Sequence, residues 1–301
     1  MEAEGMMDTM MHTAASVGIA PRGYRLPAET RLGTVRLQVS DLARSLAWYE
    51  RVLGLRVLDL SPAHATLAAH GDDAPLVELR EKAGAAPVPR RGRLGLYHFA
   101  ILLPDRAALG RFVAHLSALG ERAGASDHLV SEALYLQDPD NLGIEVYADR
   151  PRSAWRVEGR QLAMATEPLD LAGLVRVAGG EPWMGMPAGT VIGHVHLHVG
   201  DLERAAGFYH DGLGLDKIVW SYPGALFLSA GGYHHHLGLN TWAAGAAPAG
   251  ENDARLLEWE VVLPSAADVE GAIASLAAAG HAMEDGVVRD PWGTALRLRA
   301  A

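Results

Sequence analysis

Apolar and polar residues alternate with a period of two over several short stretches of the chain, and each stretch predicts a β-strand. The first strand is predicted over residues 32–39, and Ser40-Asp41 then stand where the N-cap of a helix belongs. Apolar residues recur at helical spacing as far as Leu53, and Gly54 provides a stop. Three further alternating segments complete a β-α-β-β-β unit, at about residues 55–60, 63–69 and 76–80.

This unit occurs again farther along the chain. Adding 160 to a residue number maps Tyr49 onto Tyr209 and Gly54 onto Gly214. Each half also contains a second unit, whose first strand and helix are predicted over residues 97–103 and 105–119 in one half, and over 257–263 and 265–279 in the other. The pattern therefore predicts four β-α-β-β-β units in two tandem halves.

The segments outside these units divide the chain further. Residues 1–24 show neither helical nor strand periodicity, so we expect a flexible N-terminal tail. The N-terminal half is predicted over residues 25–150 and the C-terminal half over 189–301. Between them, residues 151–188 contain Pro and Gly clusters and one short helix candidate, which is typical of a linker that packs on the surface.

The composition of the chain limits the partners and the metal ligands that it can have. The chain has 301 residues and a formal net charge of −10, which argues against a nucleic-acid partner because phosphate binding needs a basic face. It has no cysteine, so a metal site must use His, Asp, Glu or carbonyl oxygen, a donor set that suits Fe(II), Mn, Zn or Ni. No apolar run is long enough to span a membrane, and we identify no signal peptide, so we expect a cytoplasmic protein.

Two histidine runs are the clearest chemical signal. His194, His196 and His198 alternate within an apolar stretch, which places all three imidazoles on one face of a strand. Histidine is the commonest metal ligand and a frequent proton shuttle near neutral pH. In the second run, strand alternation would place His234 and His236 together and His235 on the opposite face.

Several motifs resemble the vicinal oxygen chelate superfamily, which includes glyoxalase I, the bleomycin-resistance proteins and the extradiol dioxygenases. The motif Val-x-Asp-Leu-x-x-(Ser/Ala)-x-x-(Trp/Phe)-Tyr occurs at residues 39–49 and 199–209, and Asp138-Pro139-Asp140-Asn141 precedes a predicted strand. Residues 135–139 and 233–242 resemble the two-half, catechol 2,3-dioxygenase-like branch. The resemblance implies an α+β fold, in which four βαβββ units in two tandem halves form curled mixed sheets around a metal cup.

The resemblance also implies ligand positions on the first and last strand of each unit. The first-strand positions, seven residues before the helix N-cap, are Thr34, His98, His194 and Glu258. The last-strand positions are Leu76 (with Glu78 two residues along), Glu145, His236 and Arg297. Of these, His98, Glu145, His194 and His236 are suited to a metal, whereas Glu258 and Arg297 are expected to form an ion pair. We therefore expect one metal per chain between the two central units, in contrast to extradiol enzymes whose ligands all come from the C-terminal half.

The function implied is a metal-dependent extradiol ring-cleaving dioxygenase that acts on a small catechol-like aromatic diol and O2. Fe(II) is the expected metal, with Mn, Zn or Ni as alternatives, and His196 or His234 is the expected acid–base residue. Four protein ligands would leave two open positions on the metal, which keeps a glyoxalase-like lyase or isomerase as an alternative. A non-catalytic small-molecule binding protein is a third hypothesis, and the sequence leaves a homo-oligomer open. Other candidates for the wall of the substrate cup are Trp220, Tyr222, Trp242, His128 and Tyr147.

Overall fold

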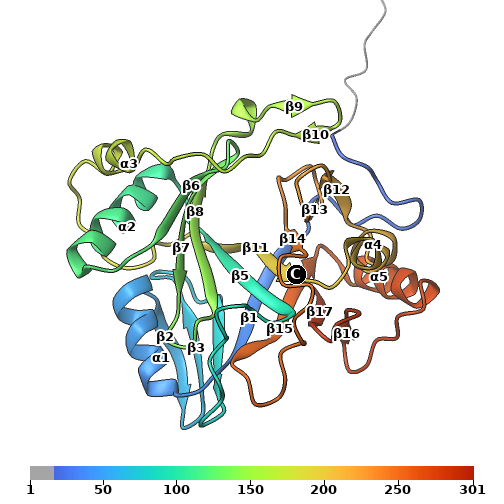
Figure 1. The fold of residues 1–301 in the computed structure, drawn as a ribbon, viewed down its shortest axis with the longest axis horizontal. Coiled ribbons are helices and arrows are strands. Elements are labelled where there is room, and N and C mark those ends of the chain that lie inside the picture. Colours follow the sequence, from blue (N-terminus) through green and yellow to red (C-terminus); the bar gives the residue numbers. More distant parts are fainter. Residues whose placement is uncertain (1–16) are drawn as a thin grey trace, which may run out of the picture.

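The computed structural model describes residues 17–301, which form two large mixed sheets with helices packed against them (Figure 1). Each half of the chain contributes one unit to each sheet; the first three units are β-α-β-β-β, and the fourth is β-α-β-β. The first and fourth units make a seven-stranded sheet, here called the outer-unit sheet, and the second and third make an eight-stranded sheet, the central-unit sheet. The predicted fold class is confirmed, including the pairing of the second unit with the third.

In the outer-unit sheet, the strands follow an order that interleaves the two ends of the chain. Across the sheet they are β16 (Val287–Arg289), β17 (Ala295–Ala300), β15 (Arg255–Leu263), β1 (Arg31–Val39), β4 (Val77–Glu81), β3 (His64–Ala68) and β2 (Arg56–Ser61). The halves meet where β1 pairs antiparallel with β15.

The central-unit sheet has the same plan. Its strands are β12 (Asp216–Val219), β13 (Ala225–Ser229), β14 (Leu237–Asn240), β11 (Val191–His198), β5 (Gly95–Leu102), β8 (Gly143–Asp149), β7 (Ser131–Gln137) and β6 (Gly124–Asp127). Here β5 pairs antiparallel with β11, and each of these two strands has a parallel partner on its other side, β8 and β14 respectively. Histidine-bearing strands from the two halves therefore lie next to each other.

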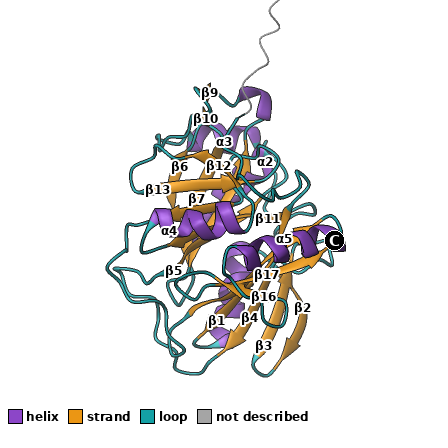
Figure 2. Cartoon of the chain, turned by 90° about the vertical axis from the view of Figure 1, so that its right-hand side faces the viewer, coloured by secondary structure: helices purple, strands orange, loops and turns teal. Residues whose placement is uncertain are grey.

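Each of the four units has its helix directly after its first strand. The helices are α1 (Leu42–Trp48) with the π-helical turn η1 (Tyr49–Leu53), α2 (Arg106–Leu119), α4 (Leu202–Ala206) with the π-helical turn η3 (Gly207–Gly212), and α5 (Ala266–Ala278). The N-cap residues Asp41, Asp105, Asp201 and Ser265 each accept the backbone N–H three residues on. In the C-terminal half, α5 packs against η3, and the Ser275 hydroxyl donates to the Gly212 carbonyl. Helices α4 and α5 both lie on the side of the molecule that faces the viewer in Figure 2.

Two tyrosines tie the units within each half. The Tyr49 hydroxyl donates to Asp138 Oδ2 at 3.3 Å, and the Tyr209 hydroxyl donates to Asp290 Oδ2 at 3.1 Å. Both tyrosines are fully buried, because they come from helices that cover one unit and reach the Asp-Pro turn of the next. These two hydrogen bonds connect the two sheets, whereas the strand pairs β1–β15 and β5–β11 connect the two halves.

The segment predicted as a linker, residues 151–188, is ordered and packed. It contains η2 (Arg152–Ala154), β9 (Val157–Glu158), β10 (Gln161–Leu162) and α3 (Leu171–Val177). Helix α3 lies close against α2, since the Cβ that Gly110 lacks would lie 2.1 Å from the Leu174 carbonyl oxygen. Residues 164–166 of this segment pass over the central-unit sheet and line a pocket there.

Of the predicted N-terminal tail, residues 1–16 lie outside the described residues. Residues 17–24 are packed against the C-terminal half: Ile19 exchanges two backbone hydrogen bonds with Lys217, and the Tyr24 hydroxyl donates to the Asp268 carbonyl. Periodicity gives no sign of these contacts, because their partners lie about 200 positions away along the chain. Within residues 17–301, no helix is long and apolar enough to cross a membrane.

The buried carboxyl group of Asp138 predicts a specific pH dependence of stability. Burial raises its pKa to about 7, although the backbone N–H groups of Leu142 and Asp140 partly offset this. A carboxyl group with a raised pKa in the folded state binds more protons than in the unfolded chain, so the stability it contributes at low pH is lost as pH rises towards 7. We expect the free energy of unfolding of the wild type to fall by roughly 3 kcal/mol relative to Asp138→Asn between pH 5 and pH 8.

Chemical denaturation at several pH values measures this difference. The amide oxygen introduced by Asp138→Asn can still accept the backbone N–H groups, so the variant should fold. Exposed Glu270, substituted as Glu270→Gln, is the control and should follow the wild type at every pH. Parallel pH curves for the wild type and Asp138→Asn would contradict the prediction.

Candidate metal centre and adjoining pocket

Three potential metal ligands meet at the junction of the two halves. His98 lies on β5, Glu145 on the neighbouring β8, and His194 on β11. The Nε2 atoms of His98 and His194 lie 3.0 Å and 3.1 Å from the same carboxylate oxygen, Glu145 Oε2. The relative exposure of the three residues is 5%, 2% and 1%. The structure therefore brings together three of the four residues predicted as ligands.

The electrostatics of this cluster suit metal binding. Burial lowers the pKa of both His98 and His194, which favours neutral imidazole, the form that coordinates a metal. Burial alone would raise the pKa of Glu145, but the two histidines hold it well below its usual value, so the group is a carboxylate. His98 Nε2 approaches this carboxylate but has no hydrogen-bond partner among residues 17–301. A buried polar atom without a partner is costly unless it binds a ligand.

The donor set fits a divalent metal ion. Two imidazole nitrogens and one carboxylate oxygen on one face of an ion form the arrangement typical of non-haem Fe(II) oxygenases. The same set also accepts other first-row divalent ions, so it does not identify the metal.

His236, the fourth predicted ligand, lies outside this cluster. Its Nδ1 accepts the backbone N–H of Ala230 and lies 2.9 Å from the Ser229 hydroxyl. The reason is the register of β14, which begins at Leu237, so that Gly238 pairs with His196 just as Glu145 pairs with Ala100 in the other unit. The structural counterpart of Glu145 is therefore a glycine. A Cβ at Gly238 would lie 2.8 Å from the His196 ring.

His196 lies beside the cluster, and Asn240 sets its tautomer. The Asn240 Oδ1 accepts the backbone N–H of Trp242, so the Nδ2 of the same amide points towards His196 Nε2 at 3.0 Å. We infer that His196 Nε2 is unprotonated and that its proton is on Nδ1. His198, on the same face, donates from Nδ1 to Asn240 Oδ1. His196 thus offers a donor rather than a base.

The positions of His234 and His235 are the reverse of those that strand alternation predicts. His235 lines the pocket, with its ring centroid 4.1 Å from that of His194, whereas His234 lies behind it. His234 Nε2 is 2.9 Å from Asp149 Oδ1, and its Nδ1 is 2.7 Å from His235 Nδ1. Alternation fails because both residues precede β14 and lie in irregular backbone. Sequence reasoning missed both His235 and Asp149: the histidine run pointed to His235, and no signal in the sequence pointed to Asp149.

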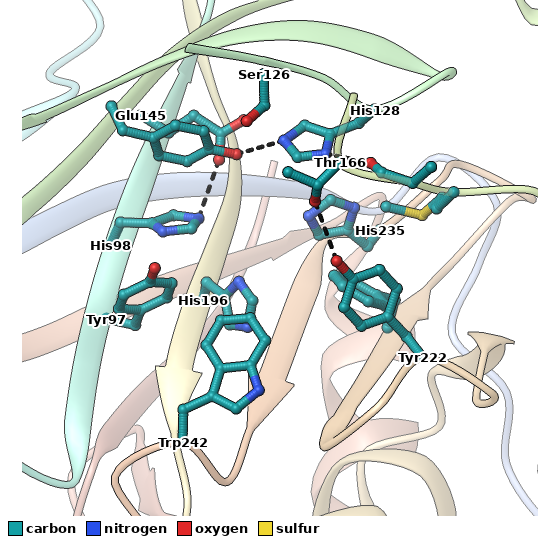
Figure 3. A pocket seen from close by; sticks show the side chains of 14 residues that line it. Tyr97, His98, Ser126, His128, Glu145, Thr166, His196, Tyr222, His235 and Trp242 are labelled. Atoms are coloured by element: carbon teal, nitrogen blue, oxygen red, sulfur yellow. Dashed lines mark hydrogen bonds and ion pairs between the residues drawn. The ribbon is translucent and has the colours of Figure 1, made fainter. Parts of the chain in front are cut away.

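A pocket of about 310 Å³ opens onto the cluster (Figure 3). Its walls come from the central-unit sheet and from residues 164–166, where the Thr166 hydroxyl is 3.0 Å from that of Tyr222. Most of the side chains are aromatic or histidine, and they include Tyr97, Tyr135, His128, Phe227 and Trp242. Of the other residues predicted for the wall, Trp220 and Tyr147 do not line the pocket, although the Tyr147 ring lies 4.9 Å from that of His194.

The equivalent position in the outer-unit sheet contains ion pairs. Arg36 pairs with Glu78 across β1 and β4, as Ala100 pairs with Glu145, and its guanidinium also binds Glu258 and Glu260. The predicted ion pair between Glu258 and Arg297 is confirmed, with Nε 2.7 Å from Oε1. A guanidinium therefore lies between the carboxylates at this position.

The chain is similar to several known proteins. The sequence profile of the Glyoxalase/Bleomycin resistance protein/Dioxygenase superfamily matches residues 31–146 and 191–297. A Bacillus subtilis (strain 168) protein named Catechol-2,3-dioxygenase is 46% identical over 261 residues, which cover 85% of this chain and 91% of that protein.

Two solved structures share the fold. A putative dioxygenase from Bacillus subtilis subsp. subtilis str. 168 has a TM-score of 0.61 at 14% identity, over 92% of this chain and 86% of that one. Glyoxalase I from Zea mays has a TM-score of 0.53 at 19% identity, over 89% of this chain and 92% of that one.

The cluster predicts which residues metal binding requires. We expect His98→Ala, Glu145→Gln and His194→Ala each to weaken binding of a divalent ion by more than about 100-fold, beyond the usual effect of losing an outer-shell partner. His236→Asn should retain one metal per chain, because the Asn oxygen can still accept the Ala230 N–H. Metal content after dialysis, measured by elemental analysis, tests this. Loss of metal in His236→Asn, with normal thermal unfolding, would restore the four-ligand set.

Proposed function

This chain belongs to the Glyoxalase/Bleomycin resistance protein/Dioxygenase superfamily, and from that premise we propose that it is a metal-dependent extradiol dioxygenase that cleaves the ring of a catechol-like aromatic diol. The observation that carries the proposal is the buried cluster of His98, Glu145 and His194 at the base of an aromatic-lined pocket. The 46% identity to a protein named Catechol-2,3-dioxygenase supports the choice of this reaction within the superfamily.

The proposed metal is Fe(II), held by His98, Glu145 and His194. When bound, it would supply adjacent coordination positions for the diol and for O2 and would carry electrons between them. The chain's own contribution is to exclude water, to orient the ring and to move protons.

We assign the acid–base role to His235, on the basis of its hydrogen bonds. Asp149 is an acceptor, so the proton of His234 belongs on Nε2, which leaves His234 Nδ1 as an acceptor. His235 must then donate from Nδ1, and its Nε2 keeps a free lone pair in the pocket wall. His235 Nε2 can therefore take a proton from the diol and return it later, as general acid–base catalysis requires. His234, expected from the sequence to do this, instead orients His235.

The other side chains of the pocket orient the ring. Phe227 and Trp242 flank His196, with ring centroids 5.8 Å from its own, and provide apolar surface for an aromatic substrate. His196 Nδ1–H is available as a donor to a developing negative charge on a substrate oxygen.

Oxygen uptake tests the proposed reaction. Protein reconstituted with Fe(II) without air and then given catechol should consume O2 and form a yellow ring-opened product in equal amounts. We expect uptake to fall to background in His98→Ala and His194→Ala, and to persist in His236→Asn. Metal binding without O2 uptake would overturn the dioxygenase and favour the lyase or isomerase.

The role of His235 has a separate test. We expect His235→Ala to lower kcat by roughly 10²- to 10⁴-fold, the usual contribution of a general acid–base residue, while metal content and KM change little. Asp149→Ala should lower kcat to a smaller extent, because it removes the acceptor that sets the tautomer of His234. His236→Asn, one position along the chain, is the matched control. An unchanged kcat in His235→Ala would exclude this residue from the acid–base role.

A further inference from the structure

A second cavity, here called the arginine groove, lies beside the metal pocket. Its volume is about 1080 Å³, and it is bounded by residues 88–92, by the start of β5, by the turn between β7 and β8, and by Arg122. Four residues line both spaces: Tyr97, His98, Tyr135 and Trp242. The two spaces therefore adjoin along these four side chains.

The groove carries positive charge that no side chain among residues 17–301 neutralises. Arg90, Arg91 and Arg122 line it, are exposed, and make no side-chain hydrogen bond or ion pair within residues 17–301. Other arginines are paired, such as Arg93, which lies close by in the chain and binds Asp253. The chain has a formal net charge of −10, so three unpaired arginines around one cavity form a positive patch on a protein that is negatively charged overall.

No protein carboxylate in the groove is available to these arginines. Asp138 is the acidic residue among those that line it, and its oxygens already accept the backbone N–H groups of Asp140 and Leu142 and the Tyr49 hydroxyl. The rest of the floor includes apolar side chains such as Leu96 and Ile144. The groove therefore combines an apolar floor with a cationic rim.

We propose that the arginine groove binds the side chain of the substrate, and that the preferred substrate is an aromatic diol whose apolar side chain ends in a carboxylate. The proposal rests on the proposed function, because it takes the metal cluster as the site of the diol. Arginine binds carboxylates through two parallel N–H donors, and the diol and the carboxylate would then fix the ring at both ends.

Matched substrates test the charge preference. We would compare catechol, 3-(3,4-dihydroxyphenyl)propanoate and the methyl ester of that acid as substrates of the Fe(II)-loaded enzyme. We expect kcat/KM for the acid to exceed that for the ester by about tenfold, since each exposed charge pair contributes a factor of about two to five. Added salt should reduce this preference, because it screens exposed charges. Equal kcat/KM for the acid and the ester would overturn the proposal.

Variants locate the preference in the groove. Arg90→Gln, Arg91→Gln and Arg122→Gln should each lower kcat/KM for the acid by about two- to fivefold, and the triple variant should treat acid and ester alike. Activity on catechol, which has no side chain, should not change. Arg31→Gln is the control, because Arg31 is an exposed, unpaired arginine at the start of β1 in the other sheet. A preference for the acid that survives the triple variant would also overturn the proposal.

A binding measurement separates this inference from the proposed reaction. Calorimetric titration of the anaerobic protein with the acid and with the ester needs no turnover. If catechol is not cleaved but the acid binds more tightly than the ester, and the triple variant loses that difference, the proposed reaction fails and the anion site stands. Equal affinities for the two compounds would exclude the anion site whichever way the reaction test turns out.

Discussion

The antiparallel pairing of β5 with β11 is the constraint on which the candidate site depends. This contact joins the two halves and brings His98 and His194 to either side of one carboxylate. Burying Glu145 would be costly without partners, and the histidines supply them only while this register holds. A shift of either strand by one residue would turn its imidazole to the opposite face of the sheet and separate the two histidines. The cluster and the junction between the halves are therefore stabilised by the same strand pair.

The two sheets compensate buried negative charge in different ways. Both have carboxylates near the junction of their central strands, Glu145 in one sheet and Glu78 and Glu258 in the other. In the outer-unit sheet the compensating cation is the Arg36 guanidinium, which is covalently fixed and fills the space. In the central-unit sheet the position equivalent to Arg36 is Ala100, so no side chain supplies the cation. The space is left for an exchangeable ion, and only this sheet has a pocket leading to its cluster among the described cavities.

Periodicity and internal repeats were sufficient to predict the units and the two tandem halves. The ligand positions came from the family resemblance, and the chemistry of the side chains at those positions then indicated the pairing of the second unit with the third and singled out His98, Glu145, His194 and His236. The structure places His236 outside the cluster, because the count of four residues crosses irregular backbone before β14 and the strand register lies two residues farther on. The roles of His235 and Asp149 depend on a contact between residues more than 80 positions apart, which no local pattern contains.

The absence of a side chain at Gly238 bears directly on the proposed chemistry. A four-ligand set would leave a six-coordinate ion two open positions, which a chelating diol would fill, leaving none for O2. With Gly238 opposite His196, the last strand of the third unit offers no ligand, and the His196 ring occupies the space instead. A metal held by His98, Glu145 and His194 alone would have room for both substrates. Gly238 therefore removes the difficulty that four protein ligands would pose for a dioxygenase, which is the lack of a position for O2. It also leaves space beside the cluster for the His196 ring, a hydrogen-bond donor.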